Sequence, residues 1–357
     1  MTKTPTFPSS SLLEVRDLRV EFDTYGGKVQ AVRGVSFSVD AGKTLAIVGE
    51  SGCGKSVTVQ SLMGLIPTPP GRITGGSVRF QDREILGLPP RLANQIRGKE
   101  IGMIFQDPMT SLNPTMTIGK QIGETIRVHE GLSEEATRER VLKLLDEVQI
   151  PEPEARIDAY PFQFSGGMRQ RVMIAMAMAC NPKLLIADEP TTALDVTVQA
   201  QILTLMKRLQ KEHHTAIILI THDLGVVAQM ADTVAVMYAG QVVETGPVDQ
   251  IFHHSAHPYT LGLRAAMPDH KESPAGASRR KLLPIEGSPP DLFAPPVGCG
   301  YYARCPYAMK ACESTLPSLE EVEAGHSSRC FLHHPMAKHR VPAGLFVGSN
   351  PTAGASR

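Results

Sequence analysis

The segment that most constrains this chain is the octapeptide GESGCGKS at residues 49–56. It follows the continuous apolar run Thr44–Val48, which predicts a strand covered on both faces, and it precedes Ser56–Leu65, which predicts a helix. The octapeptide matches the pattern G-x-x-x-x-G-K-[ST] at every position, so Lys55 is expected to reach the β- and γ-phosphates of a nucleotide and the Ser56 hydroxyl to bind Mg²⁺. The alternative is a chance glycine turn, which the flanking strand and helix disfavour.

A second apolar run, Leu184–Ala187, ends in the carboxylates Asp188 and Glu189. A strand buried on both faces would deliver Asp188 beside the Mg²⁺ and leave Glu189 where it can polarise an attacking water. Alone, the two acids would be interpreted as capping residues at a strand end. Together with the phosphate loop they favour a nucleotide-hydrolysing site.

Strands and helices alternate along the remainder of the first 250 residues. The expected elements are strands at Leu12–Val20, Gln30–Val39, Ile101–Phe105 and Ala216–Ile220, and helices at Ser133–Val148, Met168–Cys180 and Val196–Glu212. The first two strands alternate apolar and polar residues, as half-buried antiparallel strands do. The later pattern predicts a mainly parallel α/β sheet.

Composition limits the partners that the chain can have. The 357 residues carry 36 Lys and Arg against 36 Asp and Glu, so no strong general attraction to nucleic acid is expected. No uninterrupted apolar run approaches the ~18 residues that a membrane span needs. Residues 1–11 lack the apolar stretch of a signal peptide, so a cytosolic globular protein is expected.

A third motif lies between the first two. Ser165, Gly166 and Gly167 open an expected helix, and a helix N-terminus of this kind can bind an anion. Placed after a phosphate loop and before an apolar-Asp-Glu strand, this motif resembles the signature of the ATP-binding-cassette (ABC) ATPases. Gln106 is placed like the glutamine of their Q-loop, and His222 like their switch histidine.

Two weaker elements of the same set are present. Ala193-Leu194-Asp195 resembles the D-loop of the family, and Phe22, with Tyr25 as the alternative, is placed like the aromatic residue that stacks on adenine. The resemblance implies a P-loop NTPase fold of the ABC type, with a parallel RecA-like core, an antiparallel β subdomain and an inserted helical subdomain at about residues 107–165.

The resemblance also implies roles for individual residues. Similar ATPases hold two ATP molecules between two cassettes arranged head to tail, so Ser165, Gly166 and Gly167 are expected to grip the nucleotide of the partner cassette. Lys55, Glu189 and His222 are expected to serve catalysis. Ser56, Gln106 and Asp188 are expected at the Mg²⁺ ion. The expected nucleotide-binding set is Phe22, Tyr25, Gly49, Glu50, Ser51, Gly52, Cys53, Gly54, Lys55, Ser56, Val57, Gln106, Ser165, Gly166, Gly167, Asp188 and Asp195.

The C-terminal third indicates a narrower family. The segments HPYT at 257–260, PIEGSPP at 284–290 and RCP at 304–306 resemble the extension of dipeptide/oligopeptide permease ATPases, and DPMTSLNP at 107–114 resembles their helical subdomain. Met116 and its apolar neighbours are expected either to contact membrane subunits or to belong to the core. The expected domains are a cassette at 1–250, a C-terminal domain at 251–337 and a flexible tail at 338–357.

Four of the six cysteines crowd into this C-terminal domain: Cys299, Cys305, Cys312 and Cys330. Their C-x5-C-x6-C-x17-C spacing does not match the paired C-x2-C of common zinc ribbons. Four thiolates suffice for a [4Fe–4S] cluster, which some dipeptide-permease ATPases carry. We therefore expect an iron–sulfur cluster, with zinc or reduced thiols as alternatives. His326 and His333 are expected at the surface.

The function expected from the resemblance is that of an ATP-hydrolysing motor subunit of a di- or oligopeptide importer. It implies a peripheral protein at the cytoplasmic face of the membrane, a second ATPase subunit forming a heterodimer, two transmembrane permease subunits and an extracytoplasmic solute-binding protein. The transported solute stays open, with nickel and glutathione as alternatives to peptides.

Two other classes of function stay open. A soluble ABC ATPase acting on nucleic acid or ribosomes usually carries two cassettes or a coiled-coil insertion, and this chain has neither a second cassette nor a sustained heptad run. A binding module without turnover would require Glu189 to be idle.

Overall fold

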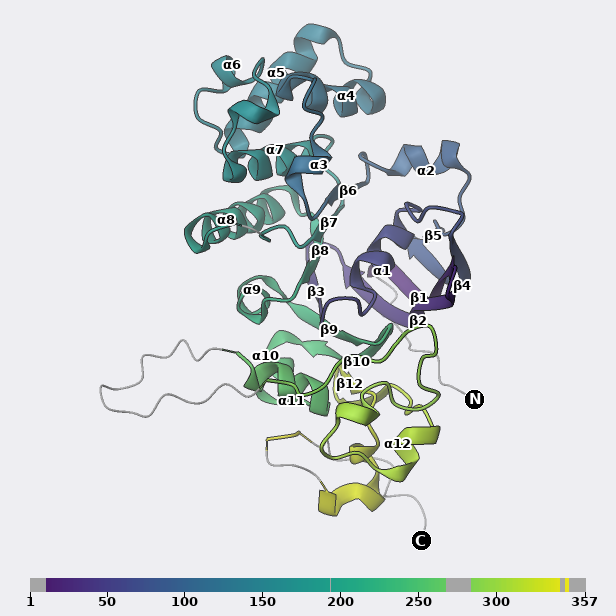
Figure 1. Ribbon diagram of the computed structural model, residues 1–357. Coiled ribbons are helices and arrows are strands. Elements are labelled where there is room, and N and C mark those ends of the chain that lie inside the picture. The colour runs from purple at the N-terminus through teal and green to yellow at the C-terminus, as the bar shows by residue number, and fades with distance from the viewer. Residues whose placement is uncertain (1–10, 193, 268–283, 341–343, 347–357) are drawn as a thin grey trace, which may run out of the picture.

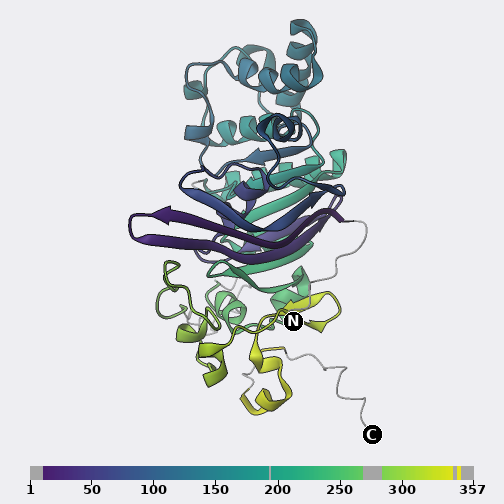
Figure 2. The same cartoon turned by 90° about the vertical axis from the view of Figure 1, so that its right-hand side faces the viewer.

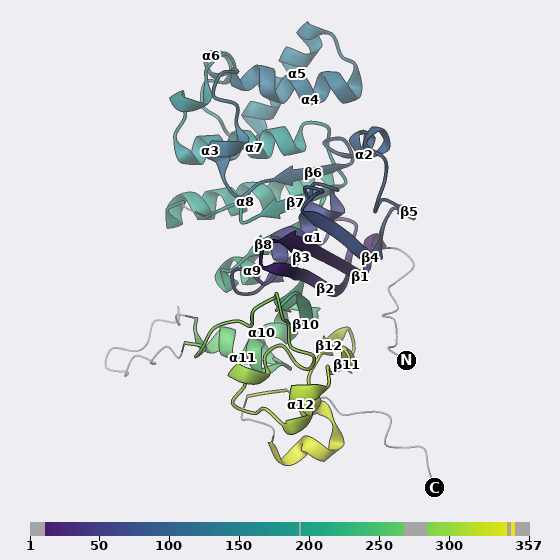
Figure 3. The same ribbon diagram turned by 45° about the vertical axis from the view of Figure 1, so that its right-hand side comes forward.

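The computed structural model describes residues 11–192, 194–267, 284–340 and 344–346. Figure 1 shows a cluster of helices at one end, two sheets in the middle and a C-terminal region at the other end, and Figures 2 and 3 show the same order from other sides. The expected D-loop residue Ala193, residues 268–283 of the expected C-terminal domain and most of the expected tail lie outside the described residues.

The main sheet carries the expected parallel core. Its order is β11-β12-β10-β9-β3-β8-β7-β6 among the described residues. The parallel strands are β3 (Thr44–Val48), β6 (Ile101–Ile104), β7 (Leu184–Asp188), β8 (Ala216–Thr221) and β9 (Thr233–Tyr238). Every residue of β3, β7 and β8 is buried. This confirms the prediction from their continuous apolar runs, because helices cover one face of the sheet and a second sheet with one helix covers the other.

A second, antiparallel sheet has the order β2-β1-β4-β5 in the described part of the chain. It comprises β1 (Ser11–Thr24), β2 (Gly27–Asp40), β4 (Gly71–Phe80) and β5 (Arg83–Glu84). The alternating apolar side chains of β1 and β2 pack into a core. This core also includes the first helix, α1, and one face of the parallel strands. The prediction of two half-buried antiparallel strands is confirmed.

The helices form three groups. Those beside the sheets are α1 (Lys55–Leu62), α2 (Pro90–Ile96), α8 (Val196–His213) and α9 (Leu224–Met230). The cluster at one end comprises α3 (Pro108–Ser111), α4 (Ile118–Glu130), α5 (Glu134–Glu147), α6 (Pro153–Arg156) and α7 (Gly166–Met178). Towards the other end lie α10 (Val248–His253), α11 (Pro258–Ala265) and α12 (Lys310–Ser314).

The cap of α5 shows how local sequence sets an element's start. Ser133 precedes the helix in an extended conformation, and its side chain accepts a hydrogen bond from the Ala136 N–H. Glu134 and Glu135 follow in the first turn, where negative charge stabilises the positive end of the helix dipole. The predicted start of this helix at Ser133 is confirmed, with Ser133 as its N-cap.

The C-terminal region, residues 284–340, joins the edge of the main sheet. Strand β10 (Gln241–Pro247) pairs with β12 (His326–Ser328), which in turn pairs with β11 (Glu320–Glu323). The fully buried carboxylate of Glu244 accepts hydrogen bonds from the N–H groups of Ala256 and His257 and contacts His326 Nε2 at 2.8 Å. The expectation that His326 lies at the surface is wrong, because this buried carboxylate fixes it in the interior.

Short 3₁₀ helices complete the described structure. They are η1 (Pro161–Gln163), η2 (Tyr302–Arg304), η3 (Phe331–His333) and η4 (Pro335–Arg340). Among the helices that the structure describes, none is long and apolar enough to cross a membrane.

Candidate nucleotide site

The loop at residues 49–54 connects β3 to α1 and packs directly against neighbouring backbone. Gly54 has φ +97°, and a Cβ there would lie 2.3 Å from the Ala31 carbonyl oxygen. Gly49 has φ +153°, and its Cβ would lie 2.2 Å from the carbonyl oxygen of Met237. Only glycine fits both positions, since each combines a positive φ with a contact that a side chain cannot make. The loop is therefore fixed by β2 on one side and β9 on the other.

The polar atoms of Lys55 and Ser56 lie at the phosphate loop and at the start of α1, as the motif predicts. The Lys55 ammonium is buried over the loop and donates to the carbonyl oxygens of Gly49 and Glu50 at 2.8 and 2.9 Å. The Ser56 hydroxyl donates to Asp188 Oδ1 at 3.0 Å. Two oxygen groups from separate elements thus converge at the start of α1, and hard oxygen ligands of this kind suit Mg²⁺.

Asp188 is the last residue of β7 and is 3% exposed. Burial raises the pKa of its carboxyl, the hydrogen bond from Ser56 opposes the rise, and the nearby Glu189 adds to it. A buried carboxylate with a raised pKa gains by binding a divalent cation, because the cation offsets the cost of desolvating the charge. The donor set of Ser56 and Asp188 therefore fits Mg²⁺.

Glu189 is the point at which three predicted residues meet. Its Oε2 accepts from Gln106 Nε2 at 3.1 Å, and its Oε1 lies 3.5 Å from His222 Nδ1. Thr192 Oγ1 also donates to Oε2 at 2.9 Å. The Glu189 backbone has φ +47°, and its N–H donates to the Ile220 carbonyl, which fixes the residue at the junction of β7 and β8.

This arrangement follows from the parallel topology. Gln106 follows β6, Glu189 follows β7 and His222 follows β8, and the carboxyl ends of adjacent parallel strands meet at one edge of a sheet. The three side chains can orient a water and contact a terminal phosphate together. Thr192 was not predicted, although its place three residues after Glu189 was a usable signal.

The signature residues do not contact the phosphate loop of their own chain in any described hydrogen bond. Ser165 caps α7 by accepting from Met168 N–H, and Gly167 lies against Val198 of α8. Asp195 caps α8 in the same way, by accepting from Val198 N–H at 2.9 Å. Ser165 and Gly166 are exposed, so the N-terminus of this 13-residue helix is open to a partner.

The two candidates for the adenine contact occupy different environments. Phe22 lies within β1, and its ring packs against the core and the backbone of Gly71. Tyr25 lies at the turn between β1 and β2 and is fully exposed. Phe22 is partly exposed, so each ring keeps a surface on which a base could stack, and Phe22 with Tyr25 as the alternative stays a prediction.

Glu50 has partners that sequence reasoning did not predict. Its N–H donates to Tyr259 Oη at 2.9 Å, and its carboxylate pairs with Arg304 from the C-terminal region. Tyr259 and Arg304 stand in the HPYT and RCP segments, but nothing in those segments indicated the loop as their target. Val57, by contrast, packs into the core behind α1.

The four C-terminal cysteines do not form the predicted metal centre. Cys299, Cys305, Cys312 and Cys330 line one cavity, but its volume is about 10 Å³. A cavity of that size holds at most about one water. Within the described ranges, no group of three or more His, Cys, Asp or Glu side chains is arranged to hold a metal ion. The prediction of a [4Fe–4S] cluster is wrong, and the zinc alternative fails on the same geometry.

The environment of these sulfurs is that of buried thiols. Burial raises the pKa of Cys299 and Cys330, and it raises the pKa of Cys305 to about 11. All six cysteines of the chain are free. The cluster therefore contributes apolar packing around Tyr301 and Leu332. Cys53 of the phosphate loop is likewise buried, with its pKa raised by burial.

Comparisons with known proteins place this geometry in a family. Residues 32–192 match the ABC transporter family model, and residues 243–312 match the model for the C-terminal region of oligopeptide/dipeptide transporters. A dimeric ATP-binding cassette solved in a post-hydrolysis state with ADP and phosphate is 27% identical, with a TM-score of 0.60, and the match covers 66% of this chain and 98% of that one.

Curated relatives match over nearly the full length. The oligopeptide transport ATP-binding protein OppD of Bacillus subtilis is 58% identical over 331 residues, covering 93% of this chain and 91% of the relative. The dipeptide transport ATP-binding protein DppD of the same species is 52% identical, covering 93% and 98%. OppD of Salmonella typhimurium is 53% identical, covering 91% and 94%. The chain is therefore an ABC-type ATPase and belongs to the family of ATP-binding subunits of oligopeptide and dipeptide ABC transporters.

Proposed function

We propose that this ATPase drives the uptake of di- or oligopeptides through separate membrane proteins, at the cytoplasmic face of the membrane. The observation that carries the proposal is the pairing of a complete set of nucleotide-site residues with a C-terminal region of the oligopeptide/dipeptide transporter type. Relatives named for oligopeptide and dipeptide transport match over nine-tenths of the chain. Nickel, glutathione and nucleic acid have no comparable support.

The working unit is a pair of cassettes. The exposed N-terminus of α7, with Ser165, Gly166 and Gly167, would grip the terminal phosphate bound at the loop of the partner cassette. Among the described residues, the side chain of Ser165 bonds only within its own helix, to the Met168 N–H. Asp195 would lie at the same interface. A solved cassette with this fold is dimeric. The second cassette is a different ATPase subunit, so that the transporter holds two distinct cassettes with two permease subunits and an extracytoplasmic solute-binding protein.

Within one site, the side chains divide the work. Residues 49–57 cradle the phosphates, with Lys55 leaving the carbonyls of Gly49 and Glu50 to meet the β- and γ-phosphates. Ser56, Gln106 and Asp188 would hold Mg²⁺, which when bound neutralises developing charge on the phosphates. Phe22, with Tyr25 as the alternative, would stack on the base.

Hydrolysis needs a base for the attacking water and a contact to the γ-phosphate that the water attacks. Glu189 is placed to accept a proton from the attacking water, with Gln106 and Thr192 orienting its carboxylate. His222, 3.5 Å from the same carboxylate, would contact the γ-phosphate.

The domain boundaries follow from the same proposal. The cassette spans residues 1–250 with a helical subdomain at about 107–165, and the C-terminal domain spans 251–337. Met116, half-buried at the start of the helical subdomain, would contact a permease subunit.

The test is reconstitution in vesicles. The chain, its companion ATPase and the permease subunits are assembled with the binding protein, and ATP-dependent uptake of labelled di- and oligopeptides is measured beside nickel and glutathione. We expect uptake of peptide alone. ATP-coupled uptake of nickel or glutathione without peptide would overturn the solute assignment, and a functional transporter with two copies of this chain would overturn the heterodimer.

A further inference from the structure

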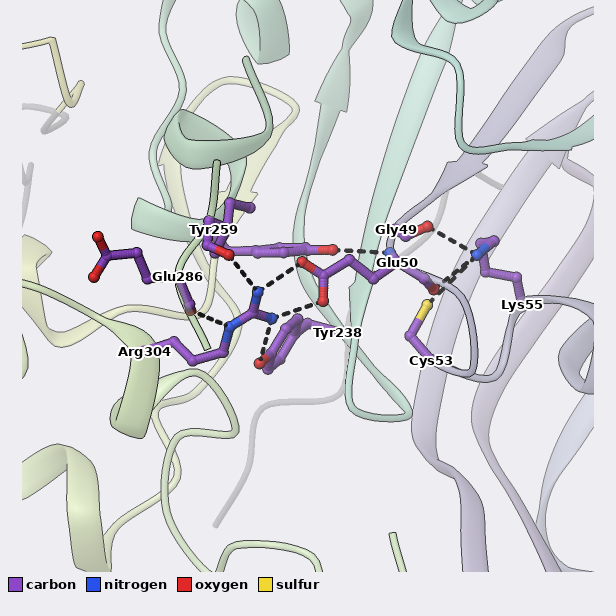
Figure 4. A network of polar contacts seen from close by, with 9 residues as sticks. Gly49, Glu50, Cys53, Lys55, Tyr238, Tyr259, Glu286 and Arg304 are labelled. Carbon is purple, nitrogen blue, oxygen red and sulfur yellow. Dashed lines mark hydrogen bonds and ion pairs between the residues drawn. The ribbon is translucent and has the colours of Figure 1, made fainter. Parts of the chain in front are cut away.

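Glu50 occupies an unusual place in the phosphate loop. Its backbone belongs to the loop, whereas its side chain points toward Arg304 of the C-terminal region, as Figure 4 shows. Arg304 Nη1 donates to Glu50 Oε2 at 2.6 Å and Arg304 Nη2 donates to Oε1 at 3.0 Å. This is a bidentate pair between residues 254 positions apart in the sequence. A planar fork of this kind fixes the direction of the carboxylate as well as its distance.

Arg304 is itself held by several segments. Its Nε donates to the Glu286 carbonyl at 2.9 Å, its Nη2 also donates to the Ile285 carbonyl at 3.2 Å, and its Nη1 also donates to Tyr238 Oη at 3.1 Å. The side chain is 6% exposed. Burial alone would lower the pKa of Arg304, but the hydrogen bonds to Glu50 and Tyr238 outweigh it and the pKa is raised. The guanidinium is therefore a fixed cation rather than a mobile surface charge.

Three tyrosine rings support the same point. Tyr238, Tyr259 and Tyr301 pack together, with ring centroids 4.6 to 5.4 Å apart. The Tyr259 hydroxyl accepts from the Glu50 N–H, so the backbone as well as the side chain of Glu50 is held from outside the loop. The C-terminal region also reaches β2, where Gln30 N–H donates to the Leu292 carbonyl at 2.9 Å.

Glu50 also contacts the phosphate-binding residue Lys55 through its backbone. The Glu50 carbonyl is one of two backbone acceptors for the Lys55 ammonium, at 2.9 Å. If Arg304 no longer fixes Glu50, which is 24% exposed at its side chain, the carboxylate can turn toward water and the loop gains freedom. A loop that must be ordered on binding gives weaker affinity than one that is already ordered.

We propose that Arg304 is a positioning residue of the nucleotide site, which makes ATP affinity depend on how the C-terminal region is seated against the phosphate loop. The inference rests on the assignment of residues 49–56 to the nucleotide phosphates. Arg304 acts through Glu50 and touches no nucleotide itself. It gives the C-terminal region a means of regulating the motor without contributing a group to the reaction.

The experiment is a titration of the full-length chain with the fluorescent nucleotide mant-ATP in the presence of Mg²⁺. Arg304→Gln, Arg304→Lys, Glu50→Gln and the double variant Glu50→Gln/Arg304→Gln are compared with the wild type. Removing the guanidinium should weaken mant-ATP binding about tenfold, and the lysine variant should recover part of this loss because it keeps the charge without the fork. The double variant should bind no more weakly than the weaker single variant, since both changes break the same pair.

A matched control separates this effect from the loss of any arginine pair. Arg83 Nη2 donates to both carboxylate oxygens of Glu100 at 2.8 and 2.9 Å, away from the phosphate loop. Arg83→Gln should leave mant-ATP affinity within about twofold of the wild type. In steady-state ATPase assays, Arg304→Gln should raise KM for ATP about tenfold with kcat nearly unchanged, a split that a general loss of folded protein would not produce.

Wild-type mant-ATP affinity in folded Arg304→Gln, or losses that add in the double variant, would overturn the inference. Should Arg304→Gln fail to fold, Arg304→Lys and Glu50→Gln carry the test. Lys55→Ala distinguishes the underlying assignment: if it binds mant-ATP as the wild type does, residues 49–56 are not the phosphate site and the role of Arg304 falls with it.

Discussion

The cassette and the C-terminal region hold their important side chains by different means. In the cassette, Gln106, Asp188 and His222 stand at or just after the ends of buried parallel strands, so the sheet alone brings them together. The C-terminal region has short strands and 3₁₀ turns. It attaches through the pairing of β12 with β10 and also through long side chains such as Arg304 and Arg329, which donate to distant carbonyls and carboxylates. In the cassette the strand order places the side chains of the nucleotide site, whereas the contact of the C-terminal region with the phosphate loop depends on single long side chains.

The largest effect is expected at the strand ends. Glu189→Gln should lower kcat for ATP by about 10²- to 10⁴-fold, because the amide cannot accept a proton from the attacking water. Binding of mant-ATP should persist. Steady-state phosphate release measures the rate, and the exposed Glu212→Gln on α8 is the control. An unchanged ATPase rate would instead support a binding module without turnover.

The next largest effect tests how tightly the cassette backbone is packed. Gly54→Ala combines a left-handed φ with a Cβ 2.3 Å from the Ala31 carbonyl, and should lower the free energy of unfolding by about 2–5 kcal/mol. Gly131, with φ +66° and open space around it, isolates the conformational cost, so Gly131→Ala should lose about 1–2 kcal/mol. Denaturant unfolding compares the two. Equal losses of unfolding free energy in the two variants would mean that β2 shifts to relieve the contact at Gly54 with little loss of stability.

A substitution at Gly298 in the C-terminal region tests whether the stability of this region affects nucleotide binding by the cassette. A Cβ at Gly298 would lie 2.2 Å from the Cys312 carbonyl oxygen, so Gly298→Ala should cost about 1–3 kcal/mol of unfolding free energy. If Arg304 couples the regions, mant-ATP affinity should fall as well, by several-fold. Gly325→Ala, at φ +73° with open space around it, destabilises the same region by backbone strain without this clash and should leave mant-ATP affinity unchanged. Reduced stability with unchanged affinity would mean that the regions are energetically separate.

Acid should lower the free energy of unfolding through the buried residue His257, which precedes α11. Burial lowers the pKa of His257 to about 3, with His333 and Arg329 contributing to the shift. Between about pH 6.5 and pH 3 the unfolded chain binds a proton at this residue while the folded chain does not. The free energy of unfolding therefore falls with falling pH, by up to about 1.4 kcal/mol per pH unit.

Replacing His257 tests this assignment. Asn can still accept from the Tyr259 N–H, so His257→Asn should flatten the dependence of stability on pH across this window, as measured by urea unfolding at successive pH values. The exposed His253→Asn should keep the wild-type slope. An unaltered slope in His257→Asn would show that other groups cause the acid sensitivity.

The smallest effect is expected at a local cap. Ser133→Ala removes the acceptor for the Ala136 N–H at the start of α5 and should cost about 1 kcal/mol of unfolding free energy. Ser133→Asp should restore it. Thermal unfolding measures both, and neither variant should change mant-ATP affinity, since the cap acts within one helix. A change in affinity would mean that the helical cluster and the phosphate loop are coupled.

The cassette could be predicted well from the sequence because its signals are local. The apolar run before Gly49 and the apolar run before Asp188 each specify a buried strand, and the parallel order then brings the residues after these strands to one edge of the sheet. The choice between Phe22 and Tyr25 for the base stays a prediction, because no periodicity distinguishes a packed ring from an exposed one at the end of a hairpin.

The C-terminal region was predicted less well for a physical reason. The clustering of Cys299, Cys305, Cys312 and Cys330 and the family resemblance suggested a metal, but neither reports the volume that the sulfurs enclose. Likewise, the burial of His326 depends on Glu244, and the fixing of Arg304 depends on Glu50. Such pairs join residues far apart in the chain, and one sequence does not reveal which charge meets which.

The late pairing of β12 with β10 bears on how the chain is made. A ribosome releases β10 well before residues 326–328 exist, so during synthesis the main sheet has an open edge that includes Val242 and Val243. Open edges recruit strands from other chains, and an inward-pointing charge discourages this. Glu244 sits on that edge. Its carboxylate would first disfavour pairing of this edge with strands of neighbouring nascent chains. After His326 emerges, the same carboxylate would form the buried contact with His326 that is present in the folded protein.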